Sequence, residues 1–268
     1  MNHKPVLLHE TLENLALREG AHIADGTLGL GGHGKAILNM IGKTGKYYGF
    51  DLDTENLEEA KKRLKDYEKQ TTFFHSNFVH CHDRLTEIGV SQIDGILLDL
   101  GLSSPHIDEP ERGFSVGEEG PLDMRFDRNS DHPKAAELVN TWPEEELKRI
   151  IYVYGEERYA PKIARLIIER RQVAPFTTTT DLLDLIDDFM KSPGDKRRVA
   201  TRLFQALRIA VNSELEVLEK ALPSLLSLLT PQGRMVVISY HSLEDRLTKR
   251  AFKKAARTCV CPPEIMRA

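Results

Sequence analysis

Short apolar runs alternate with helical stretches along residues 21–101, and this alternation restricts the fold more than any other feature. Strands are predicted over 21–25, 46–53, 71–78 and 93–101, and the segments between them have the periodicity of helices. Strands that alternate with helices are typical of a parallel sheet with helices on both faces. The sequence therefore predicts an α/β fold of the Rossmann-like type.

The alternation stops after Pro105. Residues 106 to about 132 are rich in glycine, proline and charge, which indicates a loop. Helical patterns follow over 143–154, 161–171 and 180–190, and Thr180 is the expected N-cap of the last one. We predict a helical insertion over 106–200 that buries its own smaller core, between the two parts, 1–105 and 201–268, of a discontinuous core domain.

The remaining segment returns to the sheet. One long helical pattern spans 200–229, the sequence TPQG at 230–233 predicts a turn, and a fifth strand is expected within 234–242. A basic helix over 243–257 follows it. The predicted sheet therefore has a last strand that is far from the others in sequence.

Composition limits the classes of partner. The 268 residues carry 37 Lys and Arg against 41 Asp and Glu, a net charge of −4, so a polyanion must be met by a local basic patch. No apolar run approaches the roughly 18 to 20 residues of a membrane span, so no membrane association is expected.

The cysteines favour a reducing setting. The odd number of cysteines, their low density and the absence of a secretory leader favour a location in the cytoplasm. No disulfide framework is expected. Cys259 and Cys261 form a C-x-C pair that resembles half of a metal site, but no further Cys or His lies nearby. We therefore expect no metal ion.

A glycine loop connects the first strand to the first helix of the alternating region. Residues 25–34 read DGTLGLGGHG, and the last six match G-x-G-x-x-G in the strand-to-helix context of a dinucleotide site. Asp51, beside Asp53, lies roughly 20 residues after Gly29, where a carboxylate binds ribose hydroxyls. NAD and S-adenosylmethionine fit this pattern equally well, since both contain an adenosine.

Two further features favour S-adenosylmethionine over NAD. Asp25 precedes the loop, and a carboxylate suits a ligand with an ammonium and a sulfonium better than it suits a pyrophosphate. The fourth strand ends in LLDLGLSSPH, which puts Asp99 at the crevice where an open parallel sheet binds its ligand. The alternative, a tight turn without a ligand, is disfavoured because Asp25, Asp51 and Asp99 all stand at strand ends.

Several longer strings resemble one protein family over nearly the whole chain. They are HKPVLLHE (3–10), DGTLGLGGHG, GILLDLGLSSPH, ERGFS (111–115), GPLDMRFD (120–127), YGEERYA (154–160), TRLFQALRIAVNSEL (201–215) and ISYHSLEDR (238–246). With these strings the sequence resembles the bacterial methyltransferases that modify the N4 atom of cytosine in small-subunit ribosomal RNA, the RsmH or MraW type.

The resemblance implies a Rossmann-like S-adenosylmethionine-dependent methyltransferase with an inserted helical subdomain for RNA recognition. It implies methylation of the N4 atom of a cytidine in the decoding region of 16S ribosomal RNA, with the small ribosomal subunit as partner. The cofactor contacts carried over by motif position are Gly31, Gly32, His33, Asp51, Phe78, Asp99 and His106. His106 departs from the family pattern, in which a glutamine often follows SSP. Family members also usually continue past the point where this sequence stops, into a basic segment and a further strand.

The chemistry of an exocyclic amine suggests catalytic candidates. The lone pair of the cytosine amine is delocalised into the ring, so acceptors aimed at its N–H groups favour the more tetrahedral nitrogen formed during attack. We expect Asp99, Ser103 and Ser104 to lie at this point. His241, at the end of the fifth strand, is a candidate for substrate contact or proton acceptance, against the alternative of a structural hydrogen bond.

Side chains for RNA contact are also suggested. Phe114 and Phe126 either stack on a splayed base or belong to a core. The last helix carries a basic face, and a shorter basic patch ends the insertion; each either contacts RNA or is a solvated surface. The first contains Arg246, Arg250, Lys253 and Arg257, and the second contains Lys196, Arg197 and Arg198.

Two other functions stay open at this point. One is a catalytically silent RNA-binding or ribosome-assembly protein of the same fold, and the other is a Rossmann enzyme that uses NAD. The sequence also leaves open whether the protein is a monomer or a homodimer.

Overall fold

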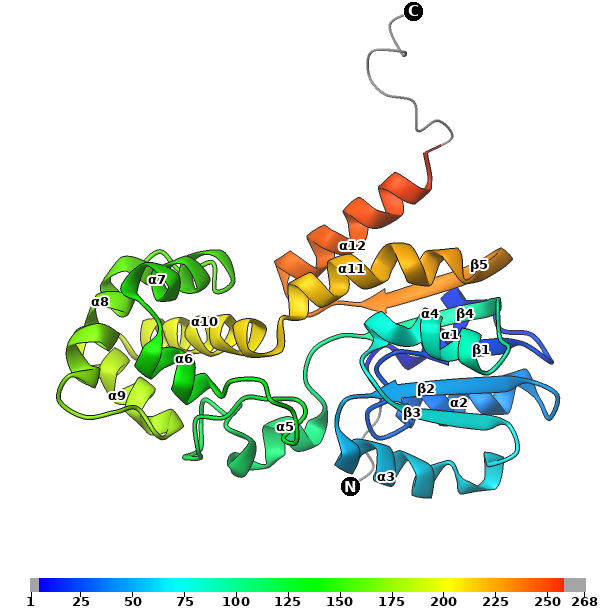
Figure 1. Ribbon diagram of the computed structural model, residues 1–268, viewed down its shortest axis with the longest axis horizontal. Helices are drawn as coiled ribbons and strands as arrows, with labels where there is room; N and C mark the ends of the chain where they lie inside the picture. The colour runs from blue at the N-terminus through cyan, green and yellow to red at the C-terminus, as the bar shows by residue number, and fades with distance from the viewer. Residues whose placement is uncertain (1–4, 258–268) are drawn as a thin grey trace, which may run out of the picture. The chain divides into compact units, whose positions relative to one another are not determined.

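The computed structural model describes residues 5–257, which form two compact units (Figure 1). The sheet unit contains residues 5–51, 55–101 and 215–257, and the helical unit contains 52–54 and 102–214. The first half of the helix expected over 200–229 thus belongs to the helical unit, which extends to residue 214. The boundaries at 105 and 200 stay a prediction.

The sheet unit is built on five parallel strands in the order β3-β2-β1-β4-β5. The strands are β1 (His22–Asp25), β2 (Lys46–Asp51), β3 (Thr71–His75), β4 (Ile93–Asp99) and β5 (Leu229–Ile238). The chain moves outward from β1 through β2 to β3, then crosses to β4 on the other side of β1. This reversal is the switch point at which open α/β sheets bind ligands, and the predicted α/β fold is confirmed.

Helices cover both faces of the sheet because neighbouring strand residues point to opposite sides. Ile23, Tyr47 and Leu97 face one apolar cluster, and Ala24 and Leu98 face the other. The first cluster is closed by α1 (Leu8–Leu15), α2 (Gly32–Ile41) and α3 (Thr54–Arg63), followed by η1 (Lys65–Tyr67). The second is closed by η2 (Phe78–His80), α4 (Cys81–Glu87), α11 (Glu214–Ser227) and α12 (Ser242–Ala255).

The helical unit has a core of its own around α10. Its elements are α5 (Ser104–Asp108), η3 (Pro110–Arg112), α6 (Ala135–Thr141), α7 (Glu144–Val153), α8 (Ala160–Arg171), α9 (Thr179–Phe189) and α10 (Pro193–Asn212). Helix α10 packs against α6, α7 and α9, and α7 packs against α8. The fully buried side chains include Leu138, Leu147, Ile150, Ile163, Ile167, Leu182, Leu203 and Leu207.

The prediction of one helix over 200–229 was wrong, because the chain turns at Ser213. Ser213 has a left-handed backbone with φ of 51°, and its N–H donates to the carbonyl of Ile209 as a helix C-cap. The preceding residue, Asn212, donates from Nδ2 to the carbonyl of Met124 and accepts from the N–H of Phe126. These bonds to a distant loop end α10 there, and periodicity alone carries no sign of them.

Two local predictions were also wrong. The sequence TPQG forms no turn between helix and strand but lies inside β5, where a register shift opposite Ile93 and Gly95 accommodates Gln232 with φ of 74°. Thr178, not Thr180, caps α9: its hydroxyl accepts from the N–H of Asp181, whose carboxylate accepts from the N–H of Thr178 at 2.9 Å. The segment predicted as a loop from 106 contains part of α5 and all of η3.

A buried charged network orders this loop-rich segment. The guanidinium of Arg112, 1% exposed, donates to Oδ2 of Asp53 at 2.6 Å and to the carbonyls of Arg125 and Phe126. His106 donates from Nε2 to the same Asp53 oxygen at 3.0 Å. Burial raises the pKa of the Asp53 carboxyl, but the hydrogen bonds from His106 and Arg112 outweigh it and hold that pKa below its usual range.

The network predicts a stability loss in acid. Because the pKa of Asp53 is lowered in the folded protein, its stabilisation is full above its unfolded pKa and disappears as the pH falls through the folded value. Asp53→Asn leaves the Arg112 charge buried without a carboxylate, so we expect the free energy of unfolding at neutral pH to fall by about 3 kcal/mol. Chemical denaturation between neutral and acidic pH measures both effects.

Asp108, an exposed carboxylate of α5, provides the matched control. Asp108→Asn should leave the free energy of unfolding within about 0.5 kcal/mol of wild type. An Asp53→Asn protein as stable as wild type, with the same dependence on pH, would contradict the role given to the network.

Candidate functional site

The carboxyl ends of β1, β2 and β4 bring three aspartates to one edge of the sheet. Asp25 ends β1, Asp51 ends β2 and Asp99 ends β4. Carboxylates grouped in this way repel one another, so each requires hydrogen-bond donors. The loop over 25–34 supplies several of these donors, and the site is built from their contacts.

Asp25 supports the loop from inside the sheet unit. It is 1% exposed, and its Oδ2 accepts from the hydroxyl of Tyr47 at 2.6 Å while Oδ1 accepts from the N–H of Thr27 at 3.0 Å. Burial raises the pKa of the Asp25 carboxyl, against the hydrogen bond from Tyr47, which lowers it. Burial also raises the pKa of Tyr47 well above its usual value, so the phenol remains the donor. Asp25 therefore supports the loop from inside, and the contact with a ligand that its sequence position suggested, direct or through water, stays a prediction.

Asp51 ties the glycine loop to β2. Its Oδ2 accepts from the N–H of Gly29 at 2.7 Å, and Nδ2 of Asn56 approaches Oδ1 at 3.5 Å. Gly29 has φ of +51°, and a Cβ added there would have its nearest neighbour at 4.0 Å. The loop thus places the Asp51 carboxylate next to the Gly29 backbone, whose outer side is open. A ribose needs such a carboxylate, and the chain attached to it needs the open space.

The other glycines of the loop serve packing inside the protein. A Cβ on Gly32 would lie 2.7 Å from Cγ of Pro5, and one on Gly34 would lie 2.6 Å from the Tyr47 hydroxyl. Gly31, with φ of +73°, faces Leu64 at 3.2 Å. Packing within the protein thus requires glycine at these positions, and Gly31 and Gly32 stay predictions as cofactor contacts.

Asp99 is the centre of a polar cluster at the end of β4. Its N–H donates to Oγ1 of Thr27 at 2.6 Å, and its Oδ1 accepts from the hydroxyl of Tyr240 at 2.8 Å. Its Oδ2 lies 3.6 Å from Nδ1 of His33. The Asp99 side chain is 23% exposed. Its orientation is therefore fixed by hydrogen bonds while part of its carboxylate stays accessible to solvent.

His33 and Phe78 lie in the same unit as this cluster. Nε2 of His33 is 3.0 Å from the carbonyl of Val6 and donates to it, and Nδ1 faces Asp99. Phe78 begins η2 and is half-buried, and a Cβ on Gly26 would come within 2.8 Å of its Cβ. Both side chains contact the loop or its neighbours, and their contact with a cofactor stays a prediction.

Ser103, Ser104 and His106 lie in the helical unit. Ser103 precedes α5, and its N–H and hydroxyl lie 3.2 and 3.1 Å from Nδ1 of His106. With Nε2 bonded to Asp53, both ring nitrogens of His106 are engaged within this unit. The ring also stacks with Phe126 at 5.3 Å between centroids and lies against Phe114 at 5.1 Å. These contacts of His106 lie within the helical unit, and its contact with a cofactor stays a prediction.

His241 is the N-cap residue of α12. Its Nε2 lies 3.2 Å from Oε1 of Glu244, and Oε2 of Glu244 accepts from the N–H of Tyr240 at 2.9 Å. Glu244 is 2% exposed, so this capping arrangement is buried. Both ring nitrogens of His241 are buried without a hydrogen-bond partner among the described residues, so the structural and the catalytic alternatives both stay predictions.

The basic face predicted on the last helix is exposed. Helix α12 has a shallow hollow lined by Ser242, Asp245, Arg246, Lys249, Arg250 and Lys253. Within it, Lys249 pairs with Asp245 at 2.9 Å. Arg250 and Lys253 are exposed on the same face, and Arg257 is exposed just beyond the helix. Positive side chains outnumber acidic ones on this surface, as phosphate contact requires.

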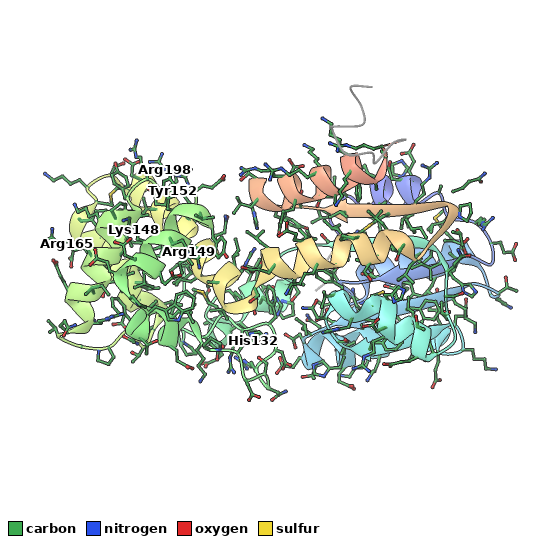
Figure 2. All side chains as sticks on the ribbon, turned by 45° about the horizontal axis from the view of Figure 1, so that its top comes forward. His132, Lys148, Arg149, Tyr152, Arg165 and Arg198 are labelled. Atoms are coloured by element: carbon green, nitrogen blue, oxygen red, sulfur yellow. The ribbon has the colours of Figure 1, made fainter. Side chains whose placement is uncertain are left out.

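Four cations of the helical unit that Figure 2 labels form ion pairs with acids. Lys148, Arg149, Arg165 and Arg198 each form an ion pair of 3.0 Å or less with an acid on their own helix. In the predicted patch at 196–198, Lys196 also pairs with Asp187 at 3.0 Å. This surface therefore attracts a polyanion less than α12 does.

Sequence reasoning missed Tyr47, Thr27 and Tyr240 as site residues. Tyr47 and Thr27 look like ordinary strand and loop residues, and only the fold brings them to Asp25 and Asp99. The one signal for Tyr240 in the sequence was the string ISYHSLEDR, in which the neighbouring His241 was taken as the candidate.

The cysteines take no part in the site among residues 5–257. Cys81 is buried, and burial raises the pKa of its thiol to about 12, which makes it unreactive. Cys259 and Cys261 lie outside the described residues. Among the described helices, none has the length and apolar character to cross a membrane.

The arrangement fits a ligand made of an adenosine and a positively charged chain. Asp51 lies at the open backbone of Gly29, and the partly exposed Asp99 supplies a second negative charge at the same edge. A pyrophosphate would meet these carboxylates with like charge. S-adenosylmethionine thus fits the residues better than NAD does.

Comparisons with known proteins agree with this geometry. The family model described as the MraW methylase family matches residues 1–268. "Ribosomal RNA small subunit methyltransferase H" of Halothermothrix orenii is 46% identical over 269 residues, covering 99% of this chain and 85% of the relative. The protein of the same name from Citrifermentans bemidjiense is 48% identical over 266 residues, covering 98% of this chain and 85% of the relative. The family model and these relatives show that the chain belongs to the MraW methylase family, and the carboxylates beside its glycine loop agree with this.

Proposed function

We propose that this protein transfers a methyl group from S-adenosylmethionine to the N4 atom of a cytidine in the decoding region of 16S ribosomal RNA. The relatives are named as small-subunit ribosomal RNA methyltransferases, which supports the RNA as substrate. The observation that carries the proposal is Asp99, a partly exposed carboxylate held beside the glycine loop. Since ribosomal subunits are made in the cytoplasm, we place the reaction there.

Family membership makes the chain a methyltransferase whose cofactor is S-adenosylmethionine. When bound, the cofactor supplies a methyl group on a sulfonium, so no metal ion is needed to activate it. Asp51 and the Gly29 backbone would hold its adenosine part, and His33 and Phe78 are the further proposed contacts. The protein's main task is then to align the amine with the methyl group.

Asp99 is the proposed acceptor for the amine. As the nitrogen attacks, its lone pair leaves conjugation with the ring and the nitrogen becomes positively charged. A carboxylate oxygen that accepts from its N–H group stabilises this charge more than the neutral ground state. The bond that Asp99 accepts from the Tyr240 hydroxyl and the bond that its N–H donates to Thr27 fix it in advance, so little reorganisation is needed. Ser103 and Ser104 are proposed as further acceptors.

The direct test is transfer of labelled methyl to small ribosomal subunits, followed by mass mapping of the RNA. We expect one methyl group on the N4 atom of a decoding-region cytidine. Binding of subunits without transfer would favour the silent RNA-binding protein, and a methyl group at another atom would refute the proposed specificity.

Replacement of the proposed acceptors should slow methyl transfer. We expect Asp99→Ala to lower the single-turnover rate constant by about 100-fold or more, because it removes a charge that stabilises the transition state. Ser104→Ala should lower the rate constant less, by about tenfold. Quench-flow assays at saturating RNA and cofactor measure both. Near-normal rate constants in both variants would eliminate this arrangement of acceptors.

The basic face of α12 should contribute to RNA affinity. Arg250→Glu combined with Lys253→Glu removes two phosphate contacts, so the slope of log affinity against log salt should become less steep by about 2. RNA binding at several salt concentrations measures the slope. Lys148→Glu with Arg165→Glu, on the charge-balanced surface, is the matched control and should change the slope less. Equal slopes in wild type and the α12 variant would exclude phosphate contact there.

A further inference from the structure

Tyr240 stands out among the aromatic side chains because it is exposed at the functional edge of the sheet. Among residues 5–257, the aromatic side chains of Tyr152 and Tyr240 are the two that are more than half exposed, at 64% and 53%. Tyr152 lies on α7 of the helical unit, whereas Tyr240 directly follows β5. The ring of Tyr240 is therefore accessible to a ligand at the carboxyl end of β5.

The ring of Tyr240 is held in place from three directions. Its hydroxyl donates to Oδ1 of Asp99 at 2.8 Å, and its backbone N–H donates to Oε2 of Glu244 at 2.9 Å. Gly101, with φ of +98°, lies against the ring, since a Cβ there would be 3.2 Å from Cδ2. The orientation of the ring is therefore set before any ligand arrives.

The hydroxyl remains protonated under ordinary conditions. Burial raises the pKa of the Tyr240 phenol, and the hydrogen bond to Asp99 raises it further. Tyr240 therefore donates to Asp99 and does not compete with it as a base. Because the Tyr240 hydroxyl lies beside the proposed acceptor Asp99, the geometry points to a role of Tyr240 in positioning the substrate.

We propose that the exposed face of the Tyr240 ring stacks on the target base and presents its amine to Asp99. This inference rests on the proposed function, because the amine of a base within a duplex is reached only when the nucleotide is splayed out. A splayed base is commonly held by stacking on an aromatic side chain. The hydroxyl contact with Asp99 couples the stacking surface to the acceptor. Tyr240 is thus a substrate-binding residue of the methyl-transfer site.

Three substitutions separate stacking from the hydroxyl contact. Tyr240→Leu removes the ring, and the single-turnover rate constant for RNA methylation should fall about 10- to 100-fold, the range of base stacking. Tyr240→Phe keeps the ring and loses the bond to Asp99, so its loss should be smaller. Tyr240→Trp should also retain more activity than Tyr240→Leu. Rapid-quench assays on small subunits at saturating RNA and cofactor give all three values.

Calorimetric titration with S-adenosylmethionine completes the test. The proposal expects a dissociation constant for the cofactor within about twofold of wild type in every Tyr240 variant. The matched control, Tyr152→Leu, replaces the other exposed tyrosine and should leave the rate constant at saturating RNA unchanged. Thermal unfolding of each variant reports whether the fold is retained.

Several results would overturn the inference. Equal losses in the Leu, Phe and Trp variants would assign the effect to the hydroxyl or to the fold. A loss in Tyr240→Leu that a higher cofactor concentration reverses would place the ring against the cofactor instead. Equal losses in Tyr240→Leu and Tyr152→Leu would show that the loss is not specific to the ring beside Asp99, which contradicts the inference. If wild type itself transfers no methyl group, the proposed function fails before this inference is reached.

Discussion

Three carboxylates at one edge of a parallel sheet are the constraint around which the sheet unit is organised. Asp25, Asp51 and Asp99 end strands that run in the same direction, so the fold itself brings their negative charges together. Each is stabilised by donors from a different element: the Tyr47 hydroxyl, the Gly29 amide and the Tyr240 hydroxyl. Each of these bonds fixes a piece of the loop or strand end that supplies the donor. The conformation of the site follows from neutralising this charge.

Burial then assigns a different role to each carboxylate. Asp25 is enclosed, and burial raises the pKa of its carboxyl, so it acts as an internal support. Asp51 holds the glycine loop at its open side, and Asp99 keeps part of its surface in solvent. The helical unit uses a similar device, in which Arg112 neutralises the buried Asp53 and His106 donates to it, and these bonds order a segment that has little regular structure. In both units a buried charge organises loops whose own sequences specify no helix or strand.

Some features of the structure were predictable from the sequence and others were not, and the reason is physical in each case. Strand and helix alternation reports burial directly, so the parallel sheet and the switch point were predictable from residues 21–101. The end of α10 depends on the bond that Asn212 donates to Met124 and the bond that it accepts from Phe126. Both partners are remote in sequence, and the helical periodicity continues past this point. The cap of α9 was misplaced by two residues because four consecutive threonines offer equivalent hydroxyls, and the position of Asp181 selects Thr178.

The sequence by itself determined the α/β class, the glycine loop and the acidic residues at the strand ends, because these depend on local periodicity and on neighbours along the chain. It also carried the strings by which the family is recognised. Only the tertiary structure decided that most loop glycines face protein, that His106 bonds to Asp53, and that Tyr240 meets Asp99. These contacts join residues far apart in sequence, and their geometry comes from strand order and packing, which no local pattern encodes.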